Sequence, residues 1–103
     1  MKIIRCLSEN IEEELHDADK YIDMAMDWKK DDEDAAELFY ELSREEMKHV
    51  DMLHEEVAKK IQAYIDAEVN PPKSMQELYD WLHKKHIETA MKIRVKQDMF
   101  KNQ

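Results

Sequence analysis

The sequence predicts an all-α fold: a long antiparallel helical hairpin followed by a third helix. The chain of 103 residues has no glycine and only two prolines, adjacent at Pro71-Pro72. Glycine and proline are the residues that tight turns and loops between strands usually need, so their scarcity argues against a β-sheet. Strong helix formers such as Glu, Lys, Ala, Leu and Met are abundant. The apolar fraction of 43% suffices for a modest core, so residues 1–103 are expected to form a single domain.

The first helix is predicted over residues 3–29. Its apolar stripe follows a 4-3 spacing that one acidic residue interrupts, and it consists of Ile4, Leu7, Ile11, Glu14, Ala18, Tyr21, Ala25 and Trp28. This period places the side chains along one face of a helix. Lys29 and Lys30 then supply positive charge that suits a helix C-terminus.

The second helix is predicted over residues 33–69. The acidic run Asp31–Asp34 offers an N-cap and a favourable first turn, and Asn70-Pro71-Pro72 stops the helix. Because only a few residues separate the first two helices, they should be antiparallel neighbours. The apolar stripe of this second helix consists of Phe39, Leu42, Glu46, His49, Leu53, Val57 and Ile61.

The third helix is predicted over residues 74–101. Ser74-Met75-Gln76-Glu77 has the pattern of a capping box, in which the serine and the glutamate satisfy free N–H groups at the helix start. The apolar face then continues through Leu78, Leu82, His86, Ala90, Ile93 and Phe100.

Glu14, Glu46 and His49 interrupt the two apolar stripes and are the candidate metal ligands. Burying a charge is costly unless the charge is paired or holds a metal. If the hairpin turn is centred near residue 30, the helical rise brings Glu14 level with Glu46 and close to His49. The third helix should pass this level near residues 95–98, where only Asp98 could add an oxygen. One chain therefore offers three good ligands, which is half of a dinuclear centre.

A different register of the second helix would remove this signal. If the buried face runs through Met47, Val50 and His54, then Glu46 and His49 lie on a solvated face. A chain with 40% charged residues forms such pairs readily, and glutamates at these positions could simply pair with lysine or arginine.

The remaining histidines have weaker patterns. His83 and His86 are three residues apart and could be ligands, but no acid joins them in register, so we interpret them as satisfied or surface residues. His16 and His54 are expected at the surface.

Composition argues against several classes of partner. The net charge of −9 argues against nucleic acid, because phosphate binding needs clustered Lys and Arg. No segment approaches the roughly 20 apolar residues of a membrane span, and the apolar stretch at residues 2–7 is too short for a secretory signal. Cys6 is the single cysteine, which excludes an intrachain disulfide. A cytoplasmic location is expected.

Residues 10–57 resemble the ferritin-like di-iron carboxylate superfamily. Glu14 together with the Glu46/His49 pair matches one half of the ligand set of that superfamily, which takes two single glutamates and two Glu-x-x-His pairs from four helices. Tyr21 follows Glu14 by seven residues, as in the Glu-x6-Tyr of ferritins and rubrerythrins. The resemblance implies that Tyr21 hydrogen-bonds a ligand carboxylate. Its hydroxyl could equally be satisfied in ordinary packing.

Since this chain carries one half-set, it is similar in plan to the short encapsulated ferritins, whose iron site forms between subunits. The resemblance implies a homodimer or larger homo-oligomer, in which two chains complete a core like that of a four-helix bundle. It also implies two iron ions per dimer (Mn or Zn being possible), ferroxidase activity and a possible enclosing protein shell. Glu46 of each chain would bridge the ions, and Glu14 and His49 would each bind one of them. The alternative function is that of a non-catalytic, acidic helical assembly or adaptor protein.

Overall fold

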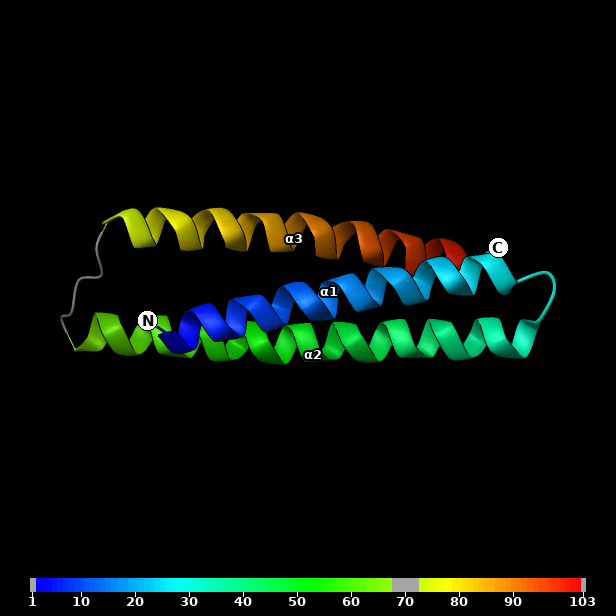
Figure 1. Ribbon diagram of the computed structural model, residues 1–103, viewed down its shortest axis with the longest axis horizontal. Helices are drawn as coiled ribbons and strands as arrows, with labels where there is room; N and C mark the ends of the chain where they lie inside the picture. The colour runs from blue at the N-terminus through cyan, green and yellow to red at the C-terminus, as the bar shows by residue number, and fades with distance from the viewer. Residues whose placement is uncertain (1, 68–72, 103) are drawn as a thin grey trace.

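The described part of the chain folds into three long helices (Figure 1). A computed structural model describes residues 2–67 and 73–102. Within these residues the chain forms α1 (Lys2–Trp28), α2 (Glu33–Asp66) and α3 (Lys73–Asn102), and it contains no strand. The predicted all-α class is therefore confirmed, and each helix begins within a residue of its expected start.

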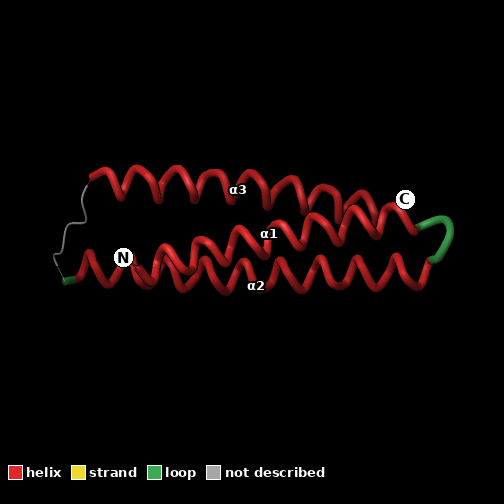
Figure 2. The backbone as a smooth tube through the Cα atoms, viewed as in Figure 1, coloured by secondary structure: helices red, strands yellow, loops and turns green. Residues whose placement is uncertain are grey.

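The helices lie side by side as a rod of 56 × 19 × 17 Å. As Figure 2 shows, α2 runs antiparallel to both α1 and α3, and the C-terminus lies at the end of the rod that holds the α1–α2 turn. At about 1.5 Å per residue, the 34 residues of α2 are long enough to span most of the rod.

The start of α2 has the cap that the acidic run predicts. The Asp32 carboxylate accepts the N–H of Ala35 at 3.0 Å, so Asp32 is the N-cap. Glu33 and Asp34 then place negative charge in the first turn, at the positive end of the helix dipole. The predicted stop at Asn70-Pro71-Pro72 lies outside the described residues, as does the side chain of Ser74 in the predicted capping box.

The core seam of α1 differs from the predicted one along one edge. The buried residues are Ile4, Ser8, Ile11, Leu15, Ala18, Ile22 and Ala25. Every second position of the predicted stripe is correct, but Leu7, Glu14 and Tyr21 are only half-buried, and the residue after each of them takes the buried position instead. Trp28 is 46% exposed. The seam has rotated toward Leu15 and Ile22 because these apolar side chains pack where α2 and α3 meet α1.

A similar rotation applies to α2, whose buried residues are Ala36, Tyr40, Ser43, Met47 and Val50. The predicted stripe through Glu46 and His49 is wrong as the core seam, and the alternative register through Met47, Val50 and His54 is the observed one. On α3 the predicted Ala90, Ile93 and Phe100 are buried, whereas Leu78 is 52% exposed.

A buried hydrogen-bond chain joins all three helices at the centre of the core. The Ser43 hydroxyl of α2 donates to the Ala18 carbonyl of α1 at 2.7 Å. The Gln97 amide of α3 donates to the same hydroxyl at 2.9 Å. Because an unpaired polar group in a core is costly, these bonds fix the relative register of the helices.

Charged contacts attach α3 to α1 along their length. The Lys96 ammonium donates to Asp19 and Asp23 at 2.8 and 2.9 Å, and these two hydrogen bonds raise the pKa of Lys96. Near the end of α3, Lys29 donates to the Phe100 carbonyl, one of the last acceptors of that helix.

Among the helices that the structure describes, none combines the length and the apolar character needed to cross a membrane.

Candidate metal centre

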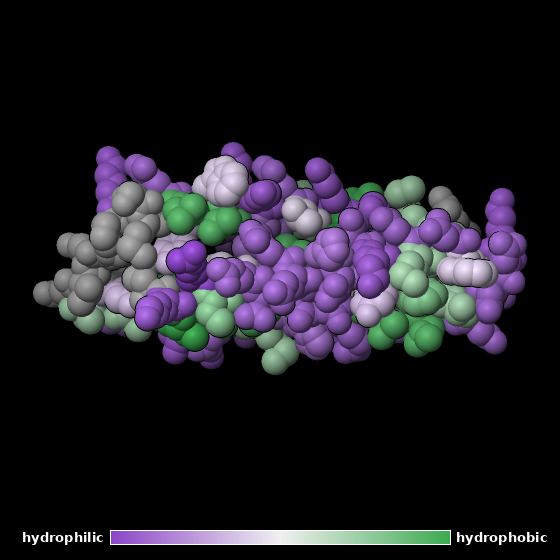
Figure 3. Space-filling view, viewed as in Figure 1, coloured by the Kyte–Doolittle hydropathy of each residue, from purple (hydrophilic) through white to green (hydrophobic). Residues whose placement is uncertain are grey.

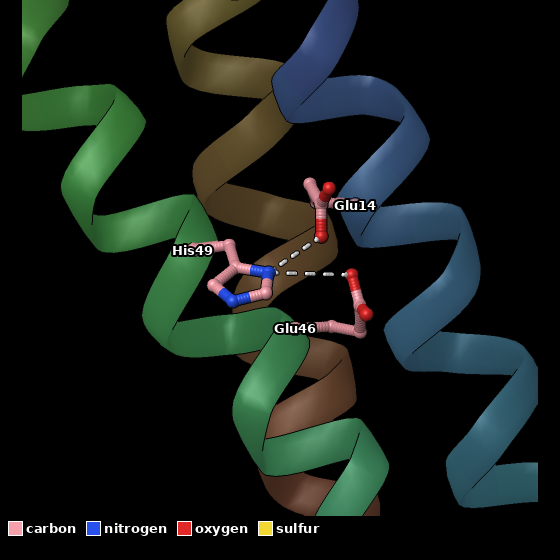
Figure 4. Close-up of side chains that lie close together, drawn as sticks. All are labelled: Glu14, Glu46 and His49. Atoms are coloured by element: carbon pink, nitrogen blue, oxygen red, sulfur yellow. Dashed lines mark hydrogen bonds and ion pairs between the residues drawn. The ribbon is translucent and has the colours of Figure 1, made fainter.

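Glu14, Glu46 and His49 meet on the face between α1 and α2. We call these three residues the carboxylate cluster. Glu14 comes from α1, whereas Glu46 and His49 lie one turn apart on α2, so the i,i+3 spacing places both α2 side chains on one face. Figure 4 shows the three side chains pointing toward one another, with α3 passing behind.

Ligand-type atoms converge within this cluster. His49 Nδ1 lies 3.1 Å from Glu14 Oε2 and 3.8 Å from Glu46 Oε2. One ligand atom from each of the three residues lies within 4.8 Å of the others. An ion about 2.1 Å from each of its ligands holds those ligand atoms about 3 Å apart. The spacing between His49 and Glu14 already matches this value, whereas the widest spacing in the cluster would have to shorten by up to about 2 Å. Carboxylate oxygens with an imidazole nitrogen form a donor set that suits Fe²⁺ or Mn²⁺, and zinc as well.

The cluster is half-exposed rather than a part of the core. The exposed fractions of the Glu14, Glu46 and His49 side chains are 26%, 19% and 49%. Sequence reasoning therefore predicted that these residues converge, but for a reason that the structure contradicts, because their charges do not occupy buried core positions. The interpretation as a metal site depends instead on two other observations. The three side chains converge, and no lysine or arginine of the described residues forms a salt bridge with either glutamate.

The two glutamates lack the lysine or arginine partners, among the described residues, that a solvated helix face would be expected to supply. Across residues 2–67 and 73–102, neither Glu14 nor Glu46 forms a salt bridge with lysine or arginine. Neighbouring Glu45, by contrast, pairs with Lys48 at 2.9 Å, and that hydrogen bond lowers the pKa of Glu45. Among the described residues, the basic group that Glu14 and Glu46 both approach is the imidazole of His49. When it is protonated, this single imidazole can neutralise at most one of the two carboxylates.

The surroundings of the cluster are half-buried apolar side chains. Leu7, Tyr21, Phe39, Leu42 and Leu53 flank it along the two helices, and all of them are partly accessible. In Figure 4 α3 passes behind the cluster, so it does not cover the side of the cluster that faces the viewer. This side is therefore a surface on which further burial is available.

Tyr21 packs against an aromatic ring in the single chain. Its ring stacks on Phe39 with centroids 6.4 Å apart, and the Lys20 ammonium lies 5.5 Å from the ring centroid. In the described part of the chain, its hydroxyl forms no hydrogen bond with the carboxylate cluster. Asp98 of α3, the other possible oxygen donor, is exposed and is not a member of the cluster.

The structure brings together a second group of imidazoles, which sequence reasoning did not predict as a group although it considered His83 and His86 as ligands. The ring of His54 lies 5.3 Å from that of His83 and 6.0 Å from that of His86, measured between centroids. His86 was expected to be a satisfied or surface residue, and it is a buried residue whose Nε2 lies 3.4 Å from the Glu12 carboxylate. His54 was expected at the surface, but it is half-buried, and its buried Nε2 has no hydrogen-bond partner among the described residues. The seam through Met47 and Val50 was the sequence signal that could have found His54.

Comparison of the chain with protein-family models, with curated proteins and with solved structures yields no match.

Proposed function

We propose that the protein binds Fe²⁺ through the carboxylate cluster and oxidises it at a dinuclear site between two copies of the chain. The observation that carries this proposal is the convergence of Glu14, Glu46 and His49 from two helices, with ligand atoms within 4.8 Å of one another. No lysine or arginine in the described residues compensates the two carboxylates. A divalent cation would do so and would use all three donors.

Two copies are needed because one chain supplies half of a dinuclear ligand set. A two-fold dimer through the cluster face would bring together four carboxylates and two imidazoles, and in such an interface each chain contributes the same patch. The four negative charges would balance two divalent ions. The half-buried apolar side chains around the cluster would become buried in the same step, which would favour association.

Iron is the substrate in this proposal, and the chain's residues hold and orient it. Glu46 of each chain would lie between the two ions, while Glu14 and His49 would each contact one ion. Two Fe²⁺ ions each give up one electron, which together with two protons reduces one O₂ to hydrogen peroxide. Tyr21 would position a ligand carboxylate through its hydroxyl, as the resemblance to ferritins implies. Storage of the ferric product would need a larger assembly or an enclosing protein shell.

The test is anaerobic titration with Fe²⁺ followed by exposure to air. We expect two irons per dimer and a ferric absorbance that develops after O₂ is admitted. Glu46→Ala should lower the initial rate of oxidation by more than about 100-fold, since even changes to residues behind the ligands cost 10–100-fold.

Glu45→Ala is the matched control, because Glu45 neighbours Glu46 on the same helix but pairs with Lys48 at the surface. This variant should oxidise iron at the wild-type rate. Equal rates for Glu46→Ala and wild type, or an absence of Fe²⁺ binding by the wild-type protein, would overturn the proposal.

A second candidate function rests on the exposed apolar side chains. Several large ones lie at the surface of the three helices, namely Trp28, Leu38, Met52, Trp81, Met91 and Val95. On the face drawn in Figure 3, hydrophilic side chains dominate the middle of the rod, and apolar ones gather toward both ends. Patches of this kind favour protein partners, so a cytoplasmic assembly or adaptor protein is the alternative. An assembly or adaptor protein would keep its oligomeric state when Glu46 is replaced by alanine. In a dimer held together by metal, the same change would weaken the association of the two chains.

A further inference from the structure

His54, His83 and His86 surround a cavity where α1, α2 and α3 meet. We call these three residues the histidine cluster. The cavity has a volume of about 290 Å³, and its wall is largely apolar, with Ile11, Val57 and Leu82 among the lining residues. All three imidazoles line it, although they come from two different helices.

His54 brings an unpaired polar atom to this cavity. Its Nε2 is buried and has no hydrogen-bond partner among the described residues. Because a buried polar atom is rarely left unpaired in a folded protein, this nitrogen is a candidate to contact a ligand. Burial lowers the pKa of His54, and the neighbouring His83 and His86 lower it further. The neutral ring that results carries a free lone pair, which is the form that binds a metal.

His86 has the second contact that metal-binding histidines typically show. It is only 4% exposed, and its Nε2 lies 3.4 Å from the Glu12 carboxylate of α1. If that nitrogen carries the proton and donates to Glu12, the other ring nitrogen is left as an acceptor. Carboxylate–histidine pairs of this kind fix the tautomer and orientation of metal ligands.

The ring spacing is close to that of imidazoles around one ion. With metal–nitrogen bonds of about 2.1 Å at tetrahedral angles, the centres of two ligating rings lie about 5 Å apart. The observed separations from His54 are 5.3 and 6.0 Å. Among the described residues only the carboxylate cluster has three ligand atoms within 4.8 Å, so the histidines must still turn inward. His83 is exposed and can rotate about its side-chain torsions.

We propose that the histidine cluster is a second metal site, which binds a borderline divalent ion of the Zn²⁺ type within a single chain. Three imidazoles form a donor set that favours zinc and its neighbours in the first transition row over calcium or magnesium. Asp80 lines the same cavity one turn before His83 and offers a carboxylate for the fourth position. The ion would connect α2 directly to the first half of α3. This site does not depend on the proposed iron chemistry.

The test uses the Glu46→Ala variant, in which the carboxylate cluster is disabled. We expect this variant to bind one Zn²⁺ per chain in calorimetric titration and to unfold at a higher temperature with Zn²⁺ than with a chelator. Co²⁺ as a spectroscopic probe should give the intense visible bands of a tetrahedral site. Adding His83→Ala should weaken Zn²⁺ binding at least tenfold. Because His83 is exposed, this change should leave the fold intact, which circular dichroism can verify.

His16→Ala in the Glu46→Ala background is the matched control, since His16 is an exposed histidine of α1 outside the cavity. It should bind Zn²⁺ as the parent variant does. The proposal is overturned if Glu46→Ala binds no Zn²⁺, which would leave water as the occupant. Equal weakening by His16→Ala and His83→Ala would also overturn it. Both results are independent of whether the wild-type protein oxidises Fe²⁺.

Discussion

The carboxylate cluster and the histidine cluster differ in donor type, burial and completeness. Glu14, Glu46 and His49 supply mostly oxygen, lie half-exposed on the α1–α2 face and already contact one another. The histidine cluster supplies nitrogen and lines a largely apolar cavity where α1, α2 and α3 meet. It contains a buried nitrogen that has no hydrogen-bond partner among the described residues. Under our proposals, the first needs a second chain and takes a hard ion, whereas the second is complete in one chain and takes a softer one.

If both proposals hold, this difference would let one small helical rod bind two kinds of metal at separate sites. Hard, oxygen-rich sites tolerate exposure because their ligands remain solvated without the ion. Buried imidazoles are stable without a metal only when they are neutral, and the lowered pKa of His54 is consistent with that state. The core between the clusters connects them, so changes to that core should affect both, while changes to a ligand should affect one.

The largest effect is expected from truncating Ile93, a residue of the core that connects the two clusters. Ile93 is fully buried among Ile11, Leu15, Met47 and Val50. Ile93→Ala should lower the free energy of unfolding by about 2–5 kcal/mol, because it leaves a cavity, and it should weaken metal binding at both clusters. Urea denaturation measures the first effect. Val95→Ala, at an exposed position of the same helix, should change stability by less than about 0.5 kcal/mol. A similarly small effect of Ile93→Ala would contradict the described core.

The change in stability on adding metal should distinguish the two clusters from each other. Fe²⁺ without oxygen, at 100 times its dissociation constant, should stabilise the wild-type protein by about 2.7 kcal/mol, since it binds only the folded state. The unfolding midpoint should also rise with protein concentration if the iron site joins two chains. In Glu46→Ala the response to Fe²⁺ should be lost while the response to Zn²⁺ persists. Thermal scans with each ion and with a chelator test this, and indifference of the wild-type midpoint to all of them would refute both sites.

Removing the central hydroxyl should have an intermediate effect. Ser43→Ala deprives the Gln97 amide of its acceptor in the core and should cost about 1–3 kcal/mol. Replacing both residues, as Ser43→Ala with Gln97→Met, should recover much of that loss because no polar group is then left unpaired. Chemical denaturation of the two variants measures the difference. A double variant that is less stable than Ser43→Ala alone would contradict this account, in which the hydrogen bonds from Gln97 to Ser43 and from Ser43 to Ala18 fix the register of the helices.

Tyr21→Phe should affect only the carboxylate cluster, and modestly. If the hydroxyl positions a ligand carboxylate in the dimer, its loss should slow iron oxidation by up to about tenfold. Stability should hardly change, because the ring still stacks on Phe39. Stopped-flow absorbance and thermal unfolding would be compared in the same samples. A fall in stability with an unchanged oxidation rate would assign Tyr21 to packing alone.

The smallest effect is expected for the ion pairs of Lys96. Hydrogen bonds to Asp19 and Asp23 raise its pKa above the ordinary value of 10.5. Their stabilisation is therefore complete below that value and is lost as the pH rises through the higher folded-state pKa. At neutral pH, Lys96→Met should cost less than about 1 kcal/mol, since the groups are partly exposed. The difference in the free energy of unfolding between wild type and variant, measured by urea denaturation, should become smaller at strongly alkaline pH. A difference that grows there would contradict the pairing of Lys96 with the two aspartates.

The helices and the convergence of the carboxylate cluster could be predicted from the sequence because both follow from local spacing. Helix periodicity and the short Asp32-capped turn fix the level at which Glu14 meets Glu46. The rotation of the core seam could not be predicted in the same way. The predicted and the observed seams of α1 share Ile4, Ile11, Ala18 and Ala25, and the choice between their other positions depends on where α3 packs.

The meeting of His54 with His83 and His86 could not be predicted for the same reason. His54 faces inward only in the register that buries Met47 and Val50, and the contact of His86 with Glu12 joins residues 74 positions apart. No pattern within one helix encodes that meeting. Leu15 and Ile22 were the available clue, since two apolar residues beside the predicted seam favour the rotated one.

The elongated shape makes assembly visible to scattering methods. A body of 56 × 19 × 17 Å tumbles anisotropically, and its maximum dimension is set by helix length alone. Pairing through a site near the middle of the rod would thicken the particle while adding little to its length. The cross-sectional radius of gyration from small-angle X-ray scattering should then rise with iron loading. End-to-end association would instead lengthen the particle at constant thickness, so the axial ratio alone distinguishes the two modes.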